Sequence, residues 1–164
     1  HSIAFAPKAD LHGRVVDSSL EGFLQAMDIS CHSFIRMARL AEPLMKDGGS
    51  LMTMSYLGGQ EVVPNYSIMG PVKAALESTV RYLAYELGEQ GIRVNAISPG
   101  TIMTRAASGI ASFDALVEEN AQRAPMGAVN IDDVGPLSVF LASDGARAIT
   151  GGKIYVDGGF NILN

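Results

Sequence analysis

Cysteine is nearly absent from the 164-residue sequence, which contains only Cys31. A single cysteine cannot form a disulfide within the chain, so a reducing compartment such as the cytoplasm is favoured. Because the neighbours of Cys31 are mostly apolar and follow a helical pattern, we expect a buried, inert thiol and not a nucleophile. His1, His12 and His32 share no metal-ligand spacing with each other or with Cys31, so we expect no metal site.

Long apolar runs and clusters of positive charge are also missing. No stretch approaches the roughly 18 apolar residues that indicate a membrane-spanning helix, so no membrane span is predicted. The 12 Lys and Arg residues are scattered and outnumbered by 17 Asp and Glu, and the formal charge of −5 argues against nucleic-acid binding. Hydrophobic residues at 48% and charged residues at 18% describe instead a compact globular segment of one domain.

A glycine-rich phosphate-binding turn after a first strand is the third missing feature. The hydrophobic pattern predicts alternating strands and helices, with strands at residues 1–7, 50–56, 92–98 and 153–160, and helices at 18–45, 64–88, 113–124 and 130–143. This order is typical of an open α/β sheet. We interpret residues 1–164 as a single segment from the C-terminal portion of a doubly wound parallel sheet, with the N-terminal Gly-rich βαβ units missing.

Cap and turn signals assign structural roles to several acidic residues. Asp132 and Asp133 lie at the start of the apolar helix expected within 130–143, so we expect one of them to be a helix cap and not the two to be a catalytic pair. Asp157, in VDGG, is expected to order a turn or an interface. The weak pattern of residues 100–125 indicates a loop and helix that bind substrate.

The segment PNYSIMGPVK, residues 64–73, places a phenol and an ammonium seven residues apart. On an ideal helix seven residues turn by about 700°, so Tyr66 and Lys73 would share one face, about 10.5 Å apart along the axis. Pro71 lies between them and would cost about 3 kcal/mol within a regular helix, so Tyr66 is expected on a distorted first turn. Taken alone, the spacing favours an ordinary amphipathic helix over a reactive pair.

Small residues at the ends of the expected strands change this interpretation. Open α/β sheets bind ligands at the carboxyl ends of their strands, and these positions carry SPG after residues 92–98 and ITGGKIYVDGG around the last strand. Together with the LGG that follows residues 50–56, they resemble the C-terminal part of the short-chain dehydrogenases and reductases, which have a Rossmann-like fold. The resemblance covers essentially the whole chain.

The details resemble one branch of that superfamily. Ordinary members carry a tyrosine four residues before the lysine, where this chain has Met69, and Tyr66 gives a spacing of seven instead. The motifs SYLGG, PNYSIMGPVKAALE, RVNAISPGTIMT and VDGGF, in this order, are similar to those of NADH-dependent enoyl-acyl-carrier-protein reductases of bacterial fatty-acid synthesis. The opening HSIAFAP is also similar to that family's strand beside the nicotinamide.

The resemblance implies three catalytic residues. Tyr66 would lie at the thioester carbonyl and stabilise the enolate that forms when hydride reaches the β carbon. Tyr56 would lie nearby, where it shapes the pocket or assists proton transfer. Lys73 would hold the ribose hydroxyls on the nicotinamide side of the cofactor. The residues leave open whether a tyrosine or water supplies the proton.

The resemblance also implies two groups of binding residues. The cofactor, NADH or NAD+, would be contacted by Ile3, Lys73, Ile102, Met103, Thr104, Arg105 and Ala106. The acyl chain would be lined by Ala6, Met69, Ile110 and Phe113, because flexible apolar side chains suit chains of different length. For each of these four residues alone, ordinary core packing is equally expected.

The implied function is reduction of a trans-2-enoyl thioester, carried by acyl carrier protein, with NADH as hydride donor. The resemblance further implies a homotetramer packed through the two long helices, in the cytoplasm. One alternative is a reductase of 3-oxoacyl thioesters or other carbonyls, which the absent four-residue spacing disfavours. Another is an inactive fragment or structural remnant that needs a partner chain, because the edge of half a sheet would be exposed.

Overall fold

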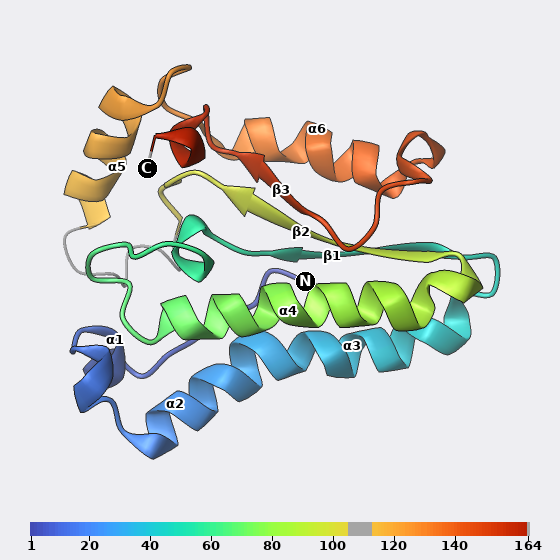
Figure 1. Ribbon diagram of the computed structural model, residues 1–164, viewed down its shortest axis with the longest axis horizontal. Coiled ribbons are helices and arrows are strands. Elements are labelled where there is room, and N and C mark those ends of the chain that lie inside the picture. Colours follow the sequence, from blue (N-terminus) through green and yellow to red (C-terminus); the bar gives the residue numbers. More distant parts are fainter. Residues whose placement is uncertain (105–112, 164) are drawn as a thin grey trace.

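A parallel sheet forms the centre of the computed structural model, which describes residues 1–104 and 113–163 (Figure 1). The strands found in these residues are β1 (Gly49–Met54), β2 (Ile92–Pro99) and β3 (Lys153–Val156), in the order β1-β2-β3. Met54 at the end of β1 pairs with Ile97 near the end of β2. Because all the strands run in one direction, their carboxyl ends lie along the same edge of the sheet.

Helices cover both faces of the sheet (Figure 1). The α-helices in the described residues are α1 (Lys8–Leu11), α2 (Leu20–Met27), α3 (Ser33–Ala41), α4 (Met69–Leu87), α5 (Phe113–Arg123) and α6 (Ile131–Ala142). α4 packs against β2, with α2 and α3 alongside it, whereas α6 packs against the opposite face of β1. Within this part of the chain, no helix has the length and apolar character needed to cross a membrane.

Shorter helical turns connect these elements. The helix predicted at 18–45 is divided by a π-helical turn (Asp28–His32) between α2 and α3, and it ends in a 3-10 turn (Glu42–Leu44). Further 3-10 turns are Val15–Asp17, Leu57–Gly59, Gly88–Gln90, Asp144–Ala146 and Phe160–Ile162. α2 begins where the Ser19 hydroxyl accepts a hydrogen bond from the backbone N–H of Gly22 at 3.0 Å.

β2 separates two apolar clusters because successive side chains of a strand point to opposite faces. Val94 and Ala96 are buried in the cluster formed with α4. Ile97 is buried in the cluster formed with α6, which includes Val134 and Leu141. β2 is therefore covered by an apolar cluster on each face, as a parallel strand between two helical layers should be.

The strand predicted at residues 1–7 is wrong. Only His1 pairs with the sheet: its amino group donates to the carbonyl of Met52 at 2.7 Å, and its carbonyl accepts from the N–H of Met54 at 3.1 Å. The chain then leaves the sheet, because both backbone groups of Phe5 bond to the buried hydroxyl of Ser30, at 2.8 and 3.0 Å. A side chain on the helical layer thus replaces a neighbouring strand as the hydrogen-bond partner.

The beginning of α4 also differs from the expected helical stripe. α4 begins at Met69, so Lys73 lies on the helix, whereas Tyr66 lies in the turn before it. Pro71 is the third residue of α4, where its missing N–H removes no hydrogen bond that the first turn of a helix would make. Tyr66 and Lys73 therefore do not share a face of one regular helix, which agrees with the expectation that the chain is distorted at Tyr66.

The acidic residues near the C-terminal elements take structural roles, although the cap residue of α6 is Asn130 and not Asp132 or Asp133 as predicted. Asn130 is the cap residue of α6, and the Asp133 carboxylate accepts a hydrogen bond from its backbone N–H at 2.8 Å, which completes a capping box. Asp157 accepts hydrogen bonds from the backbone N–H groups of Gly159 and Asn161, at 3.0 and 2.9 Å. Asp157 thereby fixes the turn that follows β3.

Candidate active site

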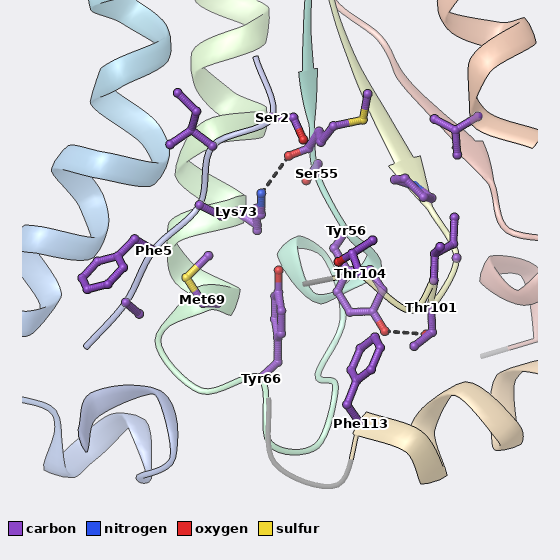
Figure 2. A pocket seen from close by; sticks show the side chains of 18 of the residues that line it. Ser2, Phe5, Ser55, Tyr56, Tyr66, Met69, Lys73, Thr101, Thr104 and Phe113 are labelled. Atoms are coloured by element: carbon purple, nitrogen blue, oxygen red, sulfur yellow. Dashed lines mark hydrogen bonds between the residues drawn. The ribbon is translucent and has the colours of Figure 1, made fainter. Parts of the chain in front are cut away.

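A cavity of about 710 Å³ lies at the carboxyl ends of β1 and β2. Residues from the N-terminal segment, from the turns after β1 and β2, and from α4, α5 and α6 line it (Figure 2). Its sequence-predicted members are Ile3, Ala6, Tyr56, Tyr66, Met69, Lys73, Ile102, Thr104 and Phe113. Ligands of open α/β folds bind at this edge of the sheet, so the cavity is the candidate active site.

Two residues in a strained conformation flank Tyr66. Asn65 and Ser67 have φ angles of 64° and 45°, in the left-handed region that residues other than glycine rarely adopt. The Ser67 hydroxyl lies 3.0 Å from the carbonyl of Asp10 and 2.8 Å from that of Gly13, and donates toward both. This contact with a distant loop holds the turn, and strained backbone of this kind is common at functional sites.

The turn directs the phenol of Tyr66 into the cavity. The residue is 7% exposed, and in Figure 2 its hydroxyl points to the space bounded by Met69 and Lys73. Within the described residues, the Tyr66 hydroxyl makes no hydrogen bond. Burial raises the pKa of Tyr66 well above its usual value, and the nearby Tyr56 and Glu77 add to the shift. The cavity therefore contains a protonated hydroxyl that is free to donate to a ligand.

Tyr56 follows β1 and lines the cavity beside Tyr66. Its hydroxyl lies 2.9 Å from the hydroxyl of Thr101, which follows β2 (Figure 2). The rings of Tyr56 and Tyr66 pack edge to face, with centroids 5.0 Å apart. Burial raises the pKa of Tyr56, and the hydrogen bond with Thr101 partly opposes this shift. Two neutral phenols thus share one wall of the cavity.

Lys73 supplies the cation of the cavity. It is 6% exposed, and its ammonium donates a hydrogen bond to the carbonyl of Met54, at the end of β1, over 2.7 Å (Figure 2). Burial lowers the pKa of Lys73 to about 8, and the charge of Glu77 opposes this shift. An ammonium has three N–H groups, so two remain for a ligand with hydroxyl groups.

Comparison with known protein families agrees with this geometry. A sequence profile described as Enoyl-(Acyl carrier protein) reductase matches residues 1–161. The chain belongs to the enoyl-acyl-carrier-protein reductase family. This reductase segment is 51% identical to an NADH enoyl-acyl-carrier-protein reductase, FabI, of Aquifex aeolicus and 49% identical to that of Bacillus cereus. Both comparisons cover 99% of the segment, which spans 61% and 64% of the length of these relatives.

Solved structures of such reductases have the same fold. The Bacillus cereus enzyme, crystallised with NADP+ and indole naphthyridinone, matches the whole reductase segment with a TM-score of 0.97 at 48% identity. The enzyme of Anaplasma phagocytophilum in complex with NAD matches it with a TM-score of 0.95 at 48% identity. The segment covers 64% and 63% of those chains. The prediction of a C-terminal portion of a Rossmann-like α/β fold is thereby confirmed.

Not every residue predicted for the reductase site lines the cavity. Met103 is absent from its walls and is 53% exposed. Arg105, Ala106 and Ile110 lie outside the described residues. Within the described residues, no group of three or more His, Cys, Asp or Glu side chains is placed to hold a metal ion.

Sequence reasoning missed several residues of the candidate site. Thr101 is 6% exposed and bonds to Tyr56, and its position directly after the SPG motif could have identified it. Met54 takes part through its backbone carbonyl, which no side-chain pattern reveals. The remaining unpredicted wall residues are Ser2, Ala4, Phe5, Leu11, Ser55, Pro99, Gly100, Ile131 and Val134.

Proposed function

We propose that residues 1–164 form the nicotinamide-facing and substrate-facing part of an NADH-dependent enoyl-acyl-carrier-protein reductase of fatty-acid synthesis. The observation that carries this proposal is that the hydroxyl of Tyr66, which makes no hydrogen bond to the described residues, and the ammonium of Lys73 line the same largely apolar cavity. The reaction would transfer a hydride to the β carbon of a trans-2-enoyl thioester and a proton to its α carbon. The names of the relatives in Aquifex aeolicus and Bacillus cereus support the same reaction.

Tyr66 would stabilise the negative charge that develops on the substrate. When hydride reaches the β carbon, electron density moves to the thioester oxygen and an enolate forms. A neutral phenol that donates to this oxygen lowers the barrier most where water is excluded, and Tyr66 is 7% exposed. Because its pKa is raised, the phenol of Tyr66 carries its proton at neutral pH and its O–H can donate a hydrogen bond to the enolate oxygen. Tyr56 would shape the pocket beside it or assist proton transfer.

The cavity also fits the nicotinamide side of a dinucleotide, which supplies the hydride when bound. The two free N–H groups of Lys73 suit the vicinal hydroxyls of a ribose. Ile3 and Ile102 form apolar parts of the cavity wall. Thr104, in the segment that follows β2, adds a side chain with a hydroxyl group. Of the other predicted cofactor residues, Met103 would contribute backbone contacts at most, and Arg105 and Ala106 stay predictions.

The acyl chain would occupy the apolar part of the cavity. Ala6, Met69 and Phe113 lie in its wall, and Ile110 is proposed to join them. Phe113 is the first residue of α5, which supports the assignment of residues 100–125 as the substrate-binding loop and helix. The physiological substrate would be attached to acyl carrier protein.

We further propose a homotetramer located in the cytoplasm. Large apolar side chains on α4 and on the turn after α3 are exposed, for example Leu44 at 82% and Tyr85 at 85%. Burial of such side chains between subunits is the usual way to remove them from water. The single cysteine supports a reducing compartment.

Oxidation of NADH by the natural full-length polypeptide that contains residues 1–164 tests the proposed function. We expect oxidation with crotonyl thioester and little with acetoacetyl thioester. Activity with acetoacetyl thioester alone would support a carbonyl reductase instead. If the full-length polypeptide oxidises NADH with neither thioester and does not bind NADH, residues 1–164 belong to an inactive remnant.

A further inference from the structure

A buried ion pair lies directly outside the wall of the cavity. The ammonium of Lys153 on β3 lies 2.9 Å from a carboxylate oxygen of Glu77 on α4, and the two side chains are 13% and 10% exposed. Neither residue lines the cavity. Two charges taken out of water contribute little net stability, because their desolvation costs about as much as their attraction gains. Stabilisation of the fold therefore does not explain the presence of this ion pair, which points to another role.

Both members of the pair hold consecutive residues at the end of β1. The Ser55 hydroxyl donates to the carboxylate of Glu77 over 2.5 Å. The ammonium of Lys153 donates to the backbone carbonyl of Tyr56 over 3.4 Å. Tyr56 is fully extended, with φ of −160° and ψ of 159°, immediately before the 3-10 turn Leu57–Gly59. Through these two hydrogen bonds the ion pair fixes the backbone at Ser55 and Tyr56, from which the Tyr56 phenol extends into the cavity.

The 3-10 turn itself fits closely between the pair and the second tyrosine. A Cβ atom on Gly59 would lie 2.7 Å from the Glu77 carboxylate, and one on Gly58 would overlap the ring of Tyr66. Glu77 is also one helical turn after Lys73 on α4, so one helix carries the catalytic cation and this carboxylate. Displacement of Glu77 would therefore be transmitted to the Tyr56 backbone and to the packing of Tyr66.

We infer that Glu77 and Lys153 act as a positioning pair that sets the direction of the Tyr56 phenol toward Thr101 and the substrate. This inference rests on the proposed function, because it assigns the pair a role in the same reaction. Neither residue touches the substrate; both act through Ser55 and Tyr56. The ion pair thus orients Tyr56 and adds little to the free energy of unfolding.

The double variant Glu77→Leu with Lys153→Met in the natural full-length polypeptide tests the inference. It removes both charges together, so no unpaired charge remains buried and the fold should persist. We expect kcat with crotonyl thioester to fall at least about tenfold, as a displaced catalytic group would cause. Glu77→Gln, which keeps the size of the side chain, should lower kcat in the same direction and serves if the double variant fails to fold.

A spectroscopic measurement separates this inference from the proposed function. With tyrosine labelled by 13C at Cζ, the Tyr56 resonance, assigned through Tyr56→Phe, should shift in both variants. Asp17→Asn, which breaks the exposed Arg14–Asp17 pair, is the matched control and should change neither kcat nor this resonance. Wild-type kcat and an unmoved resonance in the variants would overturn the inference. If the unmodified protein reduces no enoyl thioester, the proposed function fails, and the resonance alone decides the positioning role.

Discussion

The rings of Tyr56 and Tyr66 meet edge to face, with centroids 5.0 Å apart and 61° between their planes. They come from different elements, since Tyr56 follows β1 and Tyr66 lies in the turn before α4. Only Tyr56 has a hydrogen-bond partner for its hydroxyl among the described residues, namely Thr101. The two phenols are therefore chemically distinct, and this distinction leads to different expectations for their removal.

Replacement of Tyr66 by phenylalanine should remove the donor to the enolate while keeping the packing. Loss of one preorganised donor of this kind costs about 10² to 10³ in kcat. The affinity for NADH should stay unchanged, because the Tyr66 hydroxyl is assigned to the substrate. Steady-state kinetics and NADH fluorescence titration measure the two effects. Tyr82→Phe is a control, since Tyr82 is 68% exposed on α4; an equal loss in both variants would contradict the role of Tyr66.

Replacement of Thr101 by valine keeps the shape of the side chain and removes the hydroxyl that bonds to Tyr56. Because this hydrogen bond holds the Tyr56 phenol, we expect kcat to fall, but by less than in Tyr66→Phe. Thr101 should act only through Tyr56, so the double variant with Tyr56→Phe should be no slower than Tyr56→Phe alone. Additive losses in this double-mutant cycle would show that Thr101 has a separate role.

Substitution of Gly58 by alanine should disturb the Tyr66 ring, which a Cβ atom would overlap. Overpacking of this type costs about 1 to 3 kcal/mol in free energy of unfolding. Gly88→Ala is the control: Gly88 has helical backbone angles and open space around it, so alanine should stabilise by about 0.4 to 1 kcal/mol. Urea unfolding compares the variants, and equal stabilities for the two would contradict the tight packing of the turn.

The buried ammonium of Lys73 should make folding stability rise with pH. In the folded protein Lys73 releases its proton near pH 8, against 10.5 for the ordinary side chain, so between these values the unfolded state binds more protons. The cost of burying the charge is fully present below pH 8, on the order of 3 kcal/mol, and vanishes as pH approaches 10.5.

Lys73→Met isolates this contribution. We expect the variant to be more stable than the unmodified protein at pH 7 and the difference to shrink at pH 10, as measured by urea unfolding of the cofactor-free proteins. Other ionisable groups titrate in both proteins and cancel in the comparison. A difference that is independent of pH between 7 and 10 would contradict the lowered pKa of Lys73.

The sheet and the location of the site could be predicted from the sequence because both follow from local patterns. β1 and β2 carry apolar residues on both parities and are covered on both faces, and small residues such as Gly100 mark the strand ends where the cavity lies. The apolar spacing of α4 at Leu76, Val80, Leu83 and Leu87 likewise predicts the buried face that the structure shows.

The conformation around Tyr66 could not be predicted because distant contacts determine it. Ser67 bonds to the carbonyls of Asp10 and Gly13, more than 50 positions earlier in the chain, and this contact stabilises a φ that serine rarely adopts. For the same reason residues 1–7 read as a strand, although the hydroxyl of Ser30 takes the backbone hydrogen bonds of Phe5. Helical periodicity contains no information about either contact.

Transfer of deuterium from NADH dideuterated at C4 tests the central claim most directly. The natural full-length polypeptide would be incubated with crotonyl thioester and this NADH, and the saturated product analysed by NMR and mass spectrometry. The account predicts one deuterium at the β carbon and a solvent-derived hydrogen at the α carbon. Deuterium at the α carbon, or no deuterium in the saturated product, would contradict it.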